Sequence, residues 1–494
     1  MTKQQVRHLR LALALMAAGP SASSQGSTVD AFTPVQPETF ATPGAFSNAW
    51  ADFDADGDAD LAVSFRSGAV RLYRNDHGSF KEVGAQLGLP TEGPEARALA
   101  WGDFDGDGDP DLYVGAKDRG YLFRNDRAKG FNDVAAELGI APGAITSRHA
   151  SWIDYDNDGD LDLHIANRSG ANLLFRNDGS RFVETAAALG LADQRRTVGA
   201  CWFDMDQDGD LDLFLANQGG DTDALYRNDA GKFSDIAGSL GVASSGRDSS
   251  EGGVGCTVGD YDNDGDLDFF VAMYGVSRLY RNDGGAFKDV GGEAGVAVEG
   301  HAVSASWGDY DNDGDLDLYV TDYHKEGEVS RPASHLFRND GGRFSNVLGQ
   351  DSPLNAADHG VQWADFDSDG DLDVALTQGY STDAGEPVFR NEMSPQARGR
   401  SMQVAVVDWR GRATRVGSEV RVFDPAGRLL GTQIVSSGDG YNAQSAMPVR
   451  FGFIDAKRVT VEVTYLTPRG RRQQRLENVK PAQWVSRPLR VRER

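Results

Sequence analysis

Seven copies of an acidic nonapeptide, Asp-x-Asp-x-Asp-Gly-Asp-x-Asp, recur along this chain at intervals of 49 to 56 residues. Carboxylates at positions 1, 3, 5 and 9 of a tight loop, with Gly at position 6 for the turn, can converge on one hard cation. Calcium takes such oxygen ligands, whereas zinc and copper prefer His and Cys, which the nonapeptides lack. The spacing therefore predicts up to seven calcium sites. The simpler alternative is that each Asp-Gly pair only marks an exposed turn.

All five aspartates of each loop are candidate metal-binding residues, and the carbonyl of position 7 would complete the shell. They are Asp52, Asp54, Asp56, Asp58 and Asp60; Asp103, Asp105, Asp107, Asp109 and Asp111; Asp154, Asp156, Asp158, Asp160 and Asp162; Asp204, Asp206, Asp208, Asp210 and Asp212; Asp260, Asp262, Asp264, Asp266 and Asp268; Asp309, Asp311, Asp313, Asp315 and Asp317; and Asp365, Asp367, Asp369, Asp371 and Asp373.

The residues after each loop exclude an EF-hand, which needs a Glu at position 12 and helical flanks. Position 12 is aliphatic in every copy: Val63, Val114, Ile165, Leu215, Val271, Val320 and Leu376. Short apolar runs such as residues 112–114 predict a strand after the loop. Each candidate site therefore lies in a hairpin between two strands.

The remainder of each module is equally regular. A Trp stands two residues before the first Asp in six of the seven copies, and Val258 takes its place in the other. A Leu-aromatic-Arg-Asn strand or close variant follows each loop, and a Phe-x-x-Val strand or close variant follows that one in six modules. Four strands per module and seven modules predict an all-β fold, a seven-bladed β-propeller over residues 30–392. We expect the Trp side chains to pack between blades.

The two ends of the repeat array are complementary. The seventh module stops after Asn391 without its last strand, and an isolated Phe-Thr-Pro-Val lies at residues 32–35. We expect residues 32–35 to complete the last blade and so remove an open sheet edge.

Residues 395–490 have a different character, with no repeat and alternating strands near 420–423, 459–465 and 484–485. They predict a small β-sandwich-like domain. From residue 395 onward, Lys and Arg number 19 against 8 acids. The basic segments 469–472 and 487–494 could meet an acidic partner or nucleic acid, but without interleaved aromatic residues a solvated surface is the preferred interpretation.

The repeated modules resemble the FG-GAP or VCBS repeat of integrin-like propellers. The following domain resembles an ASPIC/UnbV domain through residues 416–422, the Gly-Asp-Gly-Tyr-Asn-Ala-Gln-Ser segment at 438–445, and Phe451-Gly452. The pairing is similar to that of the cartilage acidic protein family. This resemblance implies a secreted calcium-binding protein.

The residues of the amino terminus and the acidic net charge of the chain are both consistent with an exported, metal-binding protein. Basic residues before an apolar run and small residues after it predict a signal peptide at residues 1–24, and so a periplasmic or secreted protein. No apolar stretch is long enough to span a membrane. The 35 loop aspartates are almost half of the 75 acidic residues, and seven divalent ions would reduce the net charge from −26 to −12. Metal binding should therefore be coupled to stability.

The two cysteines, Cys201 and Cys256, precede the fourth and fifth Asp loops. They are expected on equivalent strands of neighbouring blades, where an oxidising compartment permits a bridge. Because they are offset by one residue in register, two buried thiols are the preferred interpretation and the disulfide the alternative.

The face of the ring opposite the Asp loops is the expected ligand face. The candidate residues there are Arg97, Arg148, His149, Arg195, Arg196, His301, His324 and His359. A non-catalytic scaffold for a protein or glycan partner is favoured, with no nucleic acid expected. A carbohydrate lyase or hydrolase using the same face is the alternative, and the residues do not indicate an oligomeric state.

Overall fold

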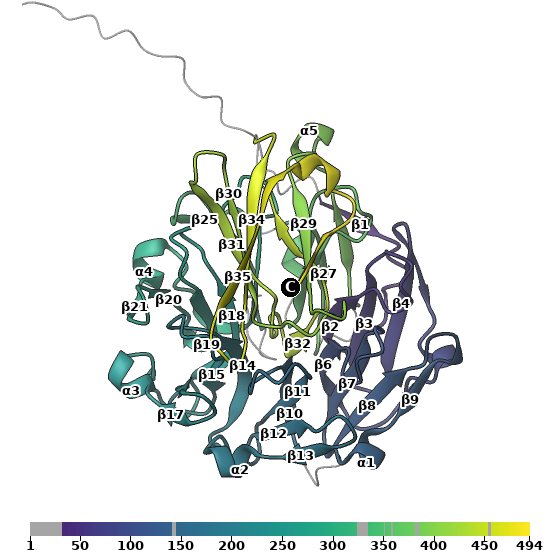
Figure 1. Ribbon diagram of the computed structural model, residues 1–494. Helices are drawn as coiled ribbons and strands as arrows, with labels where there is room; N and C mark the ends of the chain where they lie inside the picture. The colour runs from purple at the N-terminus through teal and green to yellow at the C-terminus, as the bar shows by residue number, and fades with distance from the viewer. Residues whose placement is uncertain are drawn as a thin grey trace, which may run out of the picture.

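The second strand of each module is a mostly apolar run that is buried on both faces, as residues 60–65 and 111–116 show. It lies inside an antiparallel sheet, and the sheets repeat around a ring (Figure 1). The computed structural model describes residues 32–140, 145–323, 334–349, 351–356, 359–380, 385–452 and 456–494. The predicted signal peptide, residues 1–24, lies outside these ranges. These sheets provide the predicted seven blades of an all-β propeller, two of which are joined in one eight-stranded sheet.

The strands of the first four blades run in chain order from the axis outward. Blade 1 has β2 (Ala45–Ala51), β3 (Asp60–Phe65), β4 (Val70–Asp76) and β5 (Ser79–Glu82). Blade 2 has β6 (Ala96–Gly102), β7 (Asp111–Ala116), β8 (Arg119–Asn125) and β9 (Phe131–Asp133). Blade 3 has β10 (Ser147–Ile153), β11 (Asp162–Asn167), β12 (Leu173–Asn177) and β13 (Phe182–Glu184). Blade 4 has β14 (Thr197–Phe203), β15 (Asp212–Asn217), β16 (Ala224–Asn228) and β17 (Phe233–Asp235).

The next two blades follow the same order and are joined to each other. Blade 5 has β18 (Gly252–Gly259), β19 (Asp268–Val276), β20 (Arg278–Asn282) and β21 (Phe287–Asp289). Blade 6 has β22 (Glu299–Gly308), β23 (Asp317–Asp322), β24 (His335–Asn339) and β25 (Phe344–Asn346). The long strands β19 and β22 also pair with each other beyond their blades, at Tyr274 and His301.

Blade 7 closes the ring as expected. It contains β26 (Val361–Ala364), β27 (Asp373–Leu376) and β28 (Val388–Asn391), and its outer strand is β1 (Phe32–Val35). Phe32 pairs with Asn391 and Val35 with Val388 in an antiparallel ladder. The prediction that residues 32–35 complete the last blade is confirmed, and the amino-terminal strand covers what would be an open edge.

Short helical turns follow the outer strands, except for η3, which lies between β8 and β9. They are the 3-10 turns η2 (Ala85–Leu87), η3 (Arg127–Lys129) and η4 (Pro353–Ala356), and the single-turn helices α1 (Ala135–Leu138), α2 (Ala186–Leu189), α3 (Ala237–Leu240) and α4 (Gly291–Ala294).

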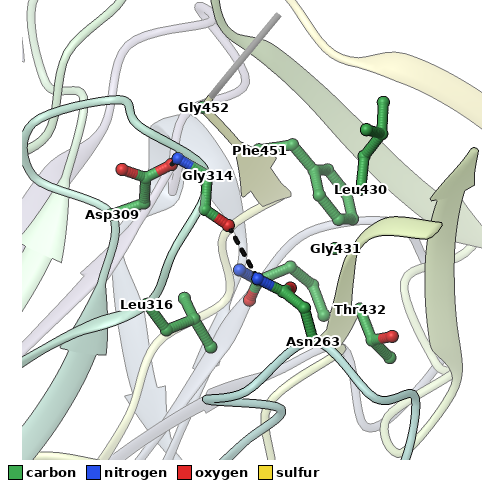
Figure 2. A pocket seen from close by; sticks show the side chains of 10 residues that line it. Asn263, Asp309, Gly314, Leu316, Leu430, Gly431, Thr432, Phe451 and Gly452 are labelled. Atoms are coloured by element: carbon green, nitrogen blue, oxygen red, sulfur yellow. Dashed lines mark hydrogen bonds between the residues drawn. The ribbon is translucent and has the colours of Figure 1, made fainter. Parts of the chain in front are cut away.

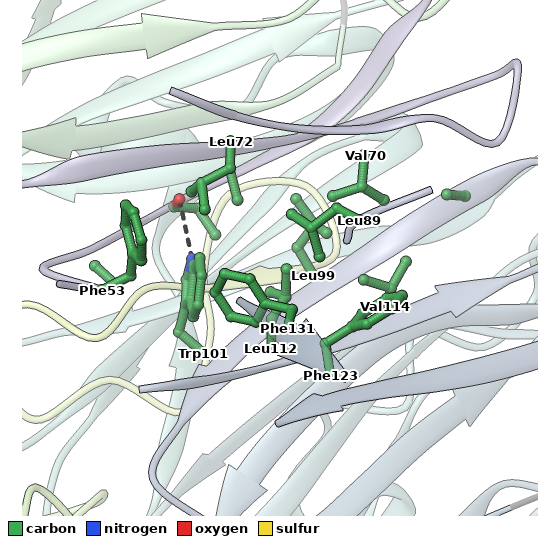
Figure 3. Packing of buried hydrophobic residues seen from close by; sticks show 14 of the residues in the cluster. Phe53, Val70, Leu72, Leu89, Leu99, Trp101, Leu112, Val114, Phe123 and Phe131 are labelled. Atoms are coloured by element: carbon green, nitrogen blue, oxygen red, sulfur yellow. Dashed lines mark hydrogen bonds between the residues drawn. The ribbon is translucent and has the colours of Figure 1, made fainter. Parts of the chain in front are cut away.

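Tryptophans form the contacts between blades, as predicted. Trp50 of blade 1 stacks on Phe366 of blade 7, with ring centroids 6.1 Å apart, and Trp152 of blade 3 stacks on Phe104 of blade 2 at 5.9 Å. Figure 3 shows the core between blades 1 and 2, where Trp101 Nε1 donates to the carbonyl of Ala49 at 3.3 Å. Burial of such large rings is a major source of cohesion between neighbouring sheets.

A disulfide joins Cys201 on β14 to Cys256 on β18, with the two Cα atoms 6.2 Å apart. The preferred interpretation, two buried thiols, was wrong. The one-residue offset persists in the strand pairing, where Cys201 lies opposite Phe214 and Cys256 opposite Val271. It does not prevent the bond, because the two Cα atoms are still within the distance that a disulfide spans. The bond ties blade 4 to blade 5.

The C-terminal domain consists of two sheets that pack on one apolar core, in agreement with the predicted sandwich. One sheet contains β29 (Met402–Val407), β33 (Val449–Phe451) and β36 (Leu489–Arg492), and the other contains β30 (Glu419–Phe423), β31 (Leu429–Ile434), β34 (Val459–Tyr465) and β35 (Arg472–Val479). Helix α5 (Pro395–Arg398) connects the ring to this domain. The strand expected at residues 484–485 was wrong, because Trp484 ends the 3-10 turn η5 (Pro481–Gln483).

Candidate metal centres

Each Asp-rich loop connects the first and second strands of its blade, and its carboxylates converge. In the first loop, one oxygen from each of Asp52, Asp54 and Asp60, at positions 1, 3 and 9, lies within 4.8 Å of the others. The next three loops bring together Asp103, Asp105 and Asp111; Asp154, Asp156 and Asp162; and Asp204, Asp206 and Asp212. In the last three loops, burial raises the pKa of Asp268, Asp317 and Asp373, and the charges at positions 1 and 3 raise it further.

The backbone of the loop explains why these side chains meet. In the first loop, Ala55 has φ of 60° and Gly57 has φ of 101°, so two left-handed residues turn the chain back on itself. The Asp52 carboxylate accepts the N–H of Asp56 at 3.0 Å and that of Gly57 at 3.1 Å. The left-handed conformation recurs at positions 4 and 6 of all seven loops. The loop is therefore organised around the position-1 carboxylate.

The position-9 carboxylate joins the loop to the rest of its blade. Asp60 is fully buried and accepts the N–H of Phe53 at 3.1 Å and that of Asn75, on the third strand, at 2.8 Å. Burial raises its pKa to about 8. In blade 2, burial raises the pKa of the equivalent Asp111 to about 9. A buried acid at this position needs a positive neighbour to stay ionised at neutral pH.

The electrostatics of the cluster favour a cation. Burial raises the pKa of Asp103 to about 6, and the charges of Asp107 and Asp105 act in the same direction. Several buried carboxylate oxygens have no hydrogen-bond partner in the described structure, among them Oδ1 of Asp54, Asp103, Asp154, Asp206, Asp262, Asp311 and Asp367. These seven belong to positions 1 and 3, the same positions that converge, and Oδ1 of Asp109 and Asp371, at position 7, is in the same state. Because all the donors are carboxylate oxygens, the set fits a hard divalent cation such as calcium better than zinc or copper.

The structure does not bring all five aspartates of each loop together. In several loops the position-7 carboxylate turns away from the cluster and accepts a backbone N–H group from the hairpin between the third and fourth strands. The pairs include Asp210 with Ala230 at 2.9 Å, Asp266 with Gly284 at 2.9 Å, and Asp315 with Gly341 at 2.8 Å. At position 5, one oxygen of Asp56 accepts the N–H of Asp58. Positions 1, 3 and 9 form the core of each cluster, with position 5 at its edge.

Arginines of the C-terminal domain contact the loops. Arg415 Nη1 lies 3.2 Å from Asp154 Oδ2, and Arg450 Nη1 lies 2.7 Å from Asp365 Oδ2. Arg471 Nε lies 3.7 Å from Asp204 Oδ2. The expectation that segment 469–472 is a solvated surface was therefore wrong for Arg471, because the acidic partner is the propeller itself. Each arginine approaches Oδ2 of position 1, while Oδ1 of Asp154 has no hydrogen-bond partner among the described residues.

A narrow pocket lies where this domain meets the fifth and sixth loops (Figure 2). It is lined by Asn263, Asp309, Gly314 and Leu316 of the ring and by residues 430–433 and 451–452 of the domain. Asn263 Nδ2 donates to the carbonyl of Gly314 at 3.3 Å and so joins two neighbouring loops. A side chain at Gly452 would collide with the Asp309 carboxylate. The domain is thus fitted closely to the Asp-loop face.

One segment of the C-terminal domain enters the centre of the ring. Residues 437–446, here called the axial segment, contain β32 (Ala443–Gln444), which pairs in parallel with β6 at Leu99 and Ala100. The segment forms hydrogen bonds with Trp50, Leu99, Trp152, Trp202, Ala305, Ser306 and Gln362, which belong to the inner strands of six blades. The axis of the propeller is therefore filled by protein.

The predicted ligand-face residues fall into three groups. Arg97, Arg148 and His359 are buried around the tip of the axial segment, where the His359 and Tyr441 rings lie 5.0 Å apart. His149 is buried beside Ser437 and Gly438, and burial lowers its pKa to about 4. The remaining described candidates lie farther out: Arg195 pairs with Asp193 and Asp235, Arg196 with Asp221, and the ring of His301 packs edge-on against Tyr274. His324 lies outside the described residues.

The Asn of each Leu-aromatic-Arg-Asn strand has a role that the sequence reading missed. Asn125 Nδ2 donates at 2.8 Å to the carbonyl of Phe53, which is position 2 of the preceding Asp loop. The same link is made by Asn75 to Phe366, Asn177 to Phe104, Asn228 to Tyr155, Asn282 to Met205, Asn339 to Tyr261 and Asn391 to Tyr310. The signal was present, since Asn recurs in all seven modules. These bonds connect the candidate metal centres around the ring.

A family comparison agrees with this repeated geometry. The model of the FG-GAP-like repeat matches residues 52–114, 103–165, 154–215, 204–271 and 260–320, which together span more than half of the chain. The chain belongs to the FG-GAP-like repeat family. Each matched FG-GAP-like window runs from one Asp loop through the next. None of the curated proteins compared matches the chain.

Several solved structures are similar to the chain at low identity. BP39L lectin from Burkholderia pseudomallei is 13% identical, with a TM-score of 0.48, over 72% of this chain and 99% of the lectin. BBS1N in complex with ARL6DN is 12% identical, with a TM-score of 0.47, over 74% of this chain and 97% of that one. An Agrocybe aegerita lectin that recognises non-reducing terminal N-acetylglucosamine is 17% identical, with a TM-score of 0.37, over 61% and 79%.

Among the described residues, no helix has the length and apolar character needed to cross a membrane.

Proposed function

We propose that the protein is an exported, calcium-stabilised FG-GAP-like propeller that acts as a binding scaffold for a protein or glycan partner. The observation that carries the proposal is the convergence of buried carboxylates at positions 1, 3 and 9, with unpartnered oxygens among them. Such a cluster is unfavourable without a cation, because burial and mutual repulsion both oppose ionisation.

Calcium would stabilise the blades rather than act on a substrate. Positions 1, 3 and 9 would hold the ion, and the position-9 carboxylate also anchors the third strand through its Asn. Binding energy at each loop would then stabilise the blade and its link to the preceding one. Burial of His149 beneath the axial segment also supports a scaffold over an enzyme that would use this imidazole.

The decisive experiment combines metal analysis with thermal unfolding of the full chain. We expect several equivalents of calcium per chain after dialysis against calcium, and a lower melting temperature after chelation. Absence of bound calcium, or an unchanged melting temperature in EDTA, would contradict the calcium part of the proposal.

A matched pair of variants in the fifth loop sharpens this test. Asp262, at position 3, has an oxygen without a partner among the described residues, whereas Asp266, at position 7, accepts the N–H of Gly284. Asp262→Asn should lose about one calcium equivalent and part of the calcium-induced rise in melting temperature. Asp266→Asn should keep the metal. Equal metal loss in both variants would show that the cluster geometry does not determine binding.

Export is also part of the proposal, supported by the basic and apolar residues of segment 1–24. Mass spectrometry of the protein purified from the extracytoplasmic fraction should find an amino terminus near residue 25. Recovery of the uncleaved chain from the cytoplasm alone would contradict it.

A further inference from the structure

The inner strands of the propeller carry a ring of bulges near the end that lies away from the Asp loops. The antiparallel register shifts between Ala45 and Asn48 in β2, and at the equivalent points of β6, β10, β14, β18 and β22. The residues at these shifts gather around Tyr441, the tip of the axial segment. They are Phe46, Arg97, Arg148, Val198, Val254 and Val303. Bulges of this kind re-aim side chains, here toward the ring axis.

Arg97 is fully engaged within this ring. Its Nη1 donates to the hydroxyl of Tyr441 at 2.8 Å and its Nη2 to the hydroxyl of Tyr380 at 2.9 Å. Its Nε pairs with Glu95 at 2.5 Å, and its guanidinium lies 3.9 Å from the ring centroid of Phe46. Arg97 therefore has a structural role, because it connects the axial segment to the propeller.

Arg148, on the next blade, lacks such partners. Its residue is only 8% exposed, and both Nε and Nη1 are buried without a hydrogen-bond partner among the described residues. Burial lowers its pKa; Tyr441 opposes that change, while the charges of Arg97 and Arg168 add to it. A buried guanidinium without an anion is costly to the folded chain. The burial of Arg148 destabilises the protein on its own, and an anionic ligand that paired with the guanidinium would offset this cost.

Aromatic rings stand beside the two arginines. Tyr380 is 40% exposed, and its ring centroid lies 5.4 Å from Phe46 and 5.1 Å from His359. The exposed Arg66 lies 5.4 Å from the same Tyr380 ring. Small-ligand sites commonly combine aromatic walls with a few charged groups that fix orientation. A partly exposed Tyr beside a buried cation has this combination.

We propose that the mouth of the ring axis binds an acidic saccharide, with the carboxylate of a uronic acid on Arg148 and the sugar ring against Tyr380. A guanidinium and a carboxylate match in charge and planar geometry, and their hydrogen bonds are charge-assisted. An aromatic face offers the sugar ring an apolar surface. The inference rests on the proposed scaffold function and names the chemistry of its ligand. The site includes Tyr441, so it is complete only when the axial segment is in place.

Calorimetric titration of the full chain in calcium provides the test, with a glucuronate-containing oligosaccharide as the probe and its neutral glucose counterpart as the comparison. The wild-type chain should bind the glucuronate probe and bind the neutral one at least about tenfold more weakly, a difference expected when a charged group loses its partner. Arg148→Gln should reduce affinity for the glucuronate probe by about tenfold or more while leaving affinity for the neutral one unchanged.

The melting temperature of the Arg148 variant distinguishes a role in ligand binding from a role in the folded structure. Because the buried Nε and Nη1 of Arg148 have no hydrogen-bond partner among the described residues, Arg148→Gln should keep or raise the melting temperature. The control is Arg196→Gln on the same face, since Arg196 is exposed and paired with Asp221 at 3.1 Å. This variant should bind the glucuronate probe as the wild type does. Tyr380→Ala should weaken both saccharides, since it removes the apolar surface from the site.

Three results would overturn the inference: no binding of the glucuronate probe by the wild type, equal binding by Arg148→Gln, or equal affinity for the charged and neutral probes. Failure of the proposed function has a different signature, which is absence of calcium and no effect of EDTA on the melting temperature. A chain that binds calcium but not glucuronate would refute only the axial site, and the reverse result would refute only the calcium-stabilised scaffold.

Discussion

At the scale of single residues, the aspartates of one loop differ in what they do. Positions 1 and 9 accept backbone N–H groups and hold the loop in shape, as Asp52 and Asp60 do in blade 1. Position 3, exemplified by Asp54, has an oxygen with no partner among the described residues. Position 7 ties down a neighbouring hairpin. One acidic motif therefore combines folding contacts with a candidate cation site.

The blade-linking Asn is the residue-scale feature most open to measurement. Asn125→Ala removes hydrogen bonds to the carbonyls of Phe53 and Pro110 in a buried setting. We expect a loss of about 1 to 3 kcal/mol in the free energy of unfolding, because two buried carbonyls lose a donor. Denaturant titration measures it. Asn132→Ala is the control, since Asn132 is exposed, its side chain donates to Asp126 at the surface, and its loss should change stability little.

At the scale of elements, the axial segment is the least expected part of the fold. Gly440 has φ of 62°, and a Cβ there would lie 2.4 Å from the carbonyl oxygen of Val361. Gly440→Ala should destabilise the chain by roughly 1 to 3 kcal/mol, since both the left-handed backbone and the close approach disfavour a side chain.

Differential scanning calorimetry would detect this loss as a lower melting temperature. Gly238→Ala, in helix α3, is the matched control, because a Cβ added there would have nothing within 4 Å. It should be neutral or slightly stabilising. If the two variants melted alike, the axial segment would not be packed as the structure shows.

Some of these elements can be predicted from the sequence and others cannot. The Asp loops, the four strands of a blade and the closing strand β1 follow from local patterns repeated seven times. The axial segment does not, because Ser437 meets Trp202 across 235 residues and no repeat marks the pairing. The sequence predicts a solvated Arg471 for the same reason, since its partner Asp204 belongs to another domain. In the candidate site, the position-7 carboxylate turns outward because it bonds to a hairpin elsewhere in the blade. The nonapeptide alone does not predict this orientation.

At the scale of the whole molecule, we expect the loops to make stability depend on both pH and metal. Carboxyls such as Asp60 and Asp111 have pKa values raised from 3.8 to about 8 and about 9, mainly by burial. The folded chain without metal therefore holds protons more tightly than the unfolded chain does. Their contribution to stability is fully present below the unfolded pKa and is lost as pH rises through the folded pKa.

In EDTA, the melting temperature should therefore decrease as the pH is raised from about 4 to about 9. In excess calcium the trend between pH 5 and 7 should reverse or flatten, since protons compete with the ion for the same oxygens. Thermal scans at constant ionic strength would test both statements. Parallel pH profiles with and without calcium would show that these carboxyls do not bind it.

The distance along the chain between Arg97 and its partner Tyr441 has a consequence for biogenesis. The two residues are 344 positions apart, and the inner edge of β6 pairs with β32 only after the second domain has been made. Contacts of such long range form late and slowly. During synthesis, the propeller of a nascent chain would lack its axial segment until the last fifth of the chain has been made. Chaperone protection during that interval would matter more for this protein than for a propeller whose axis is not filled by a segment made later.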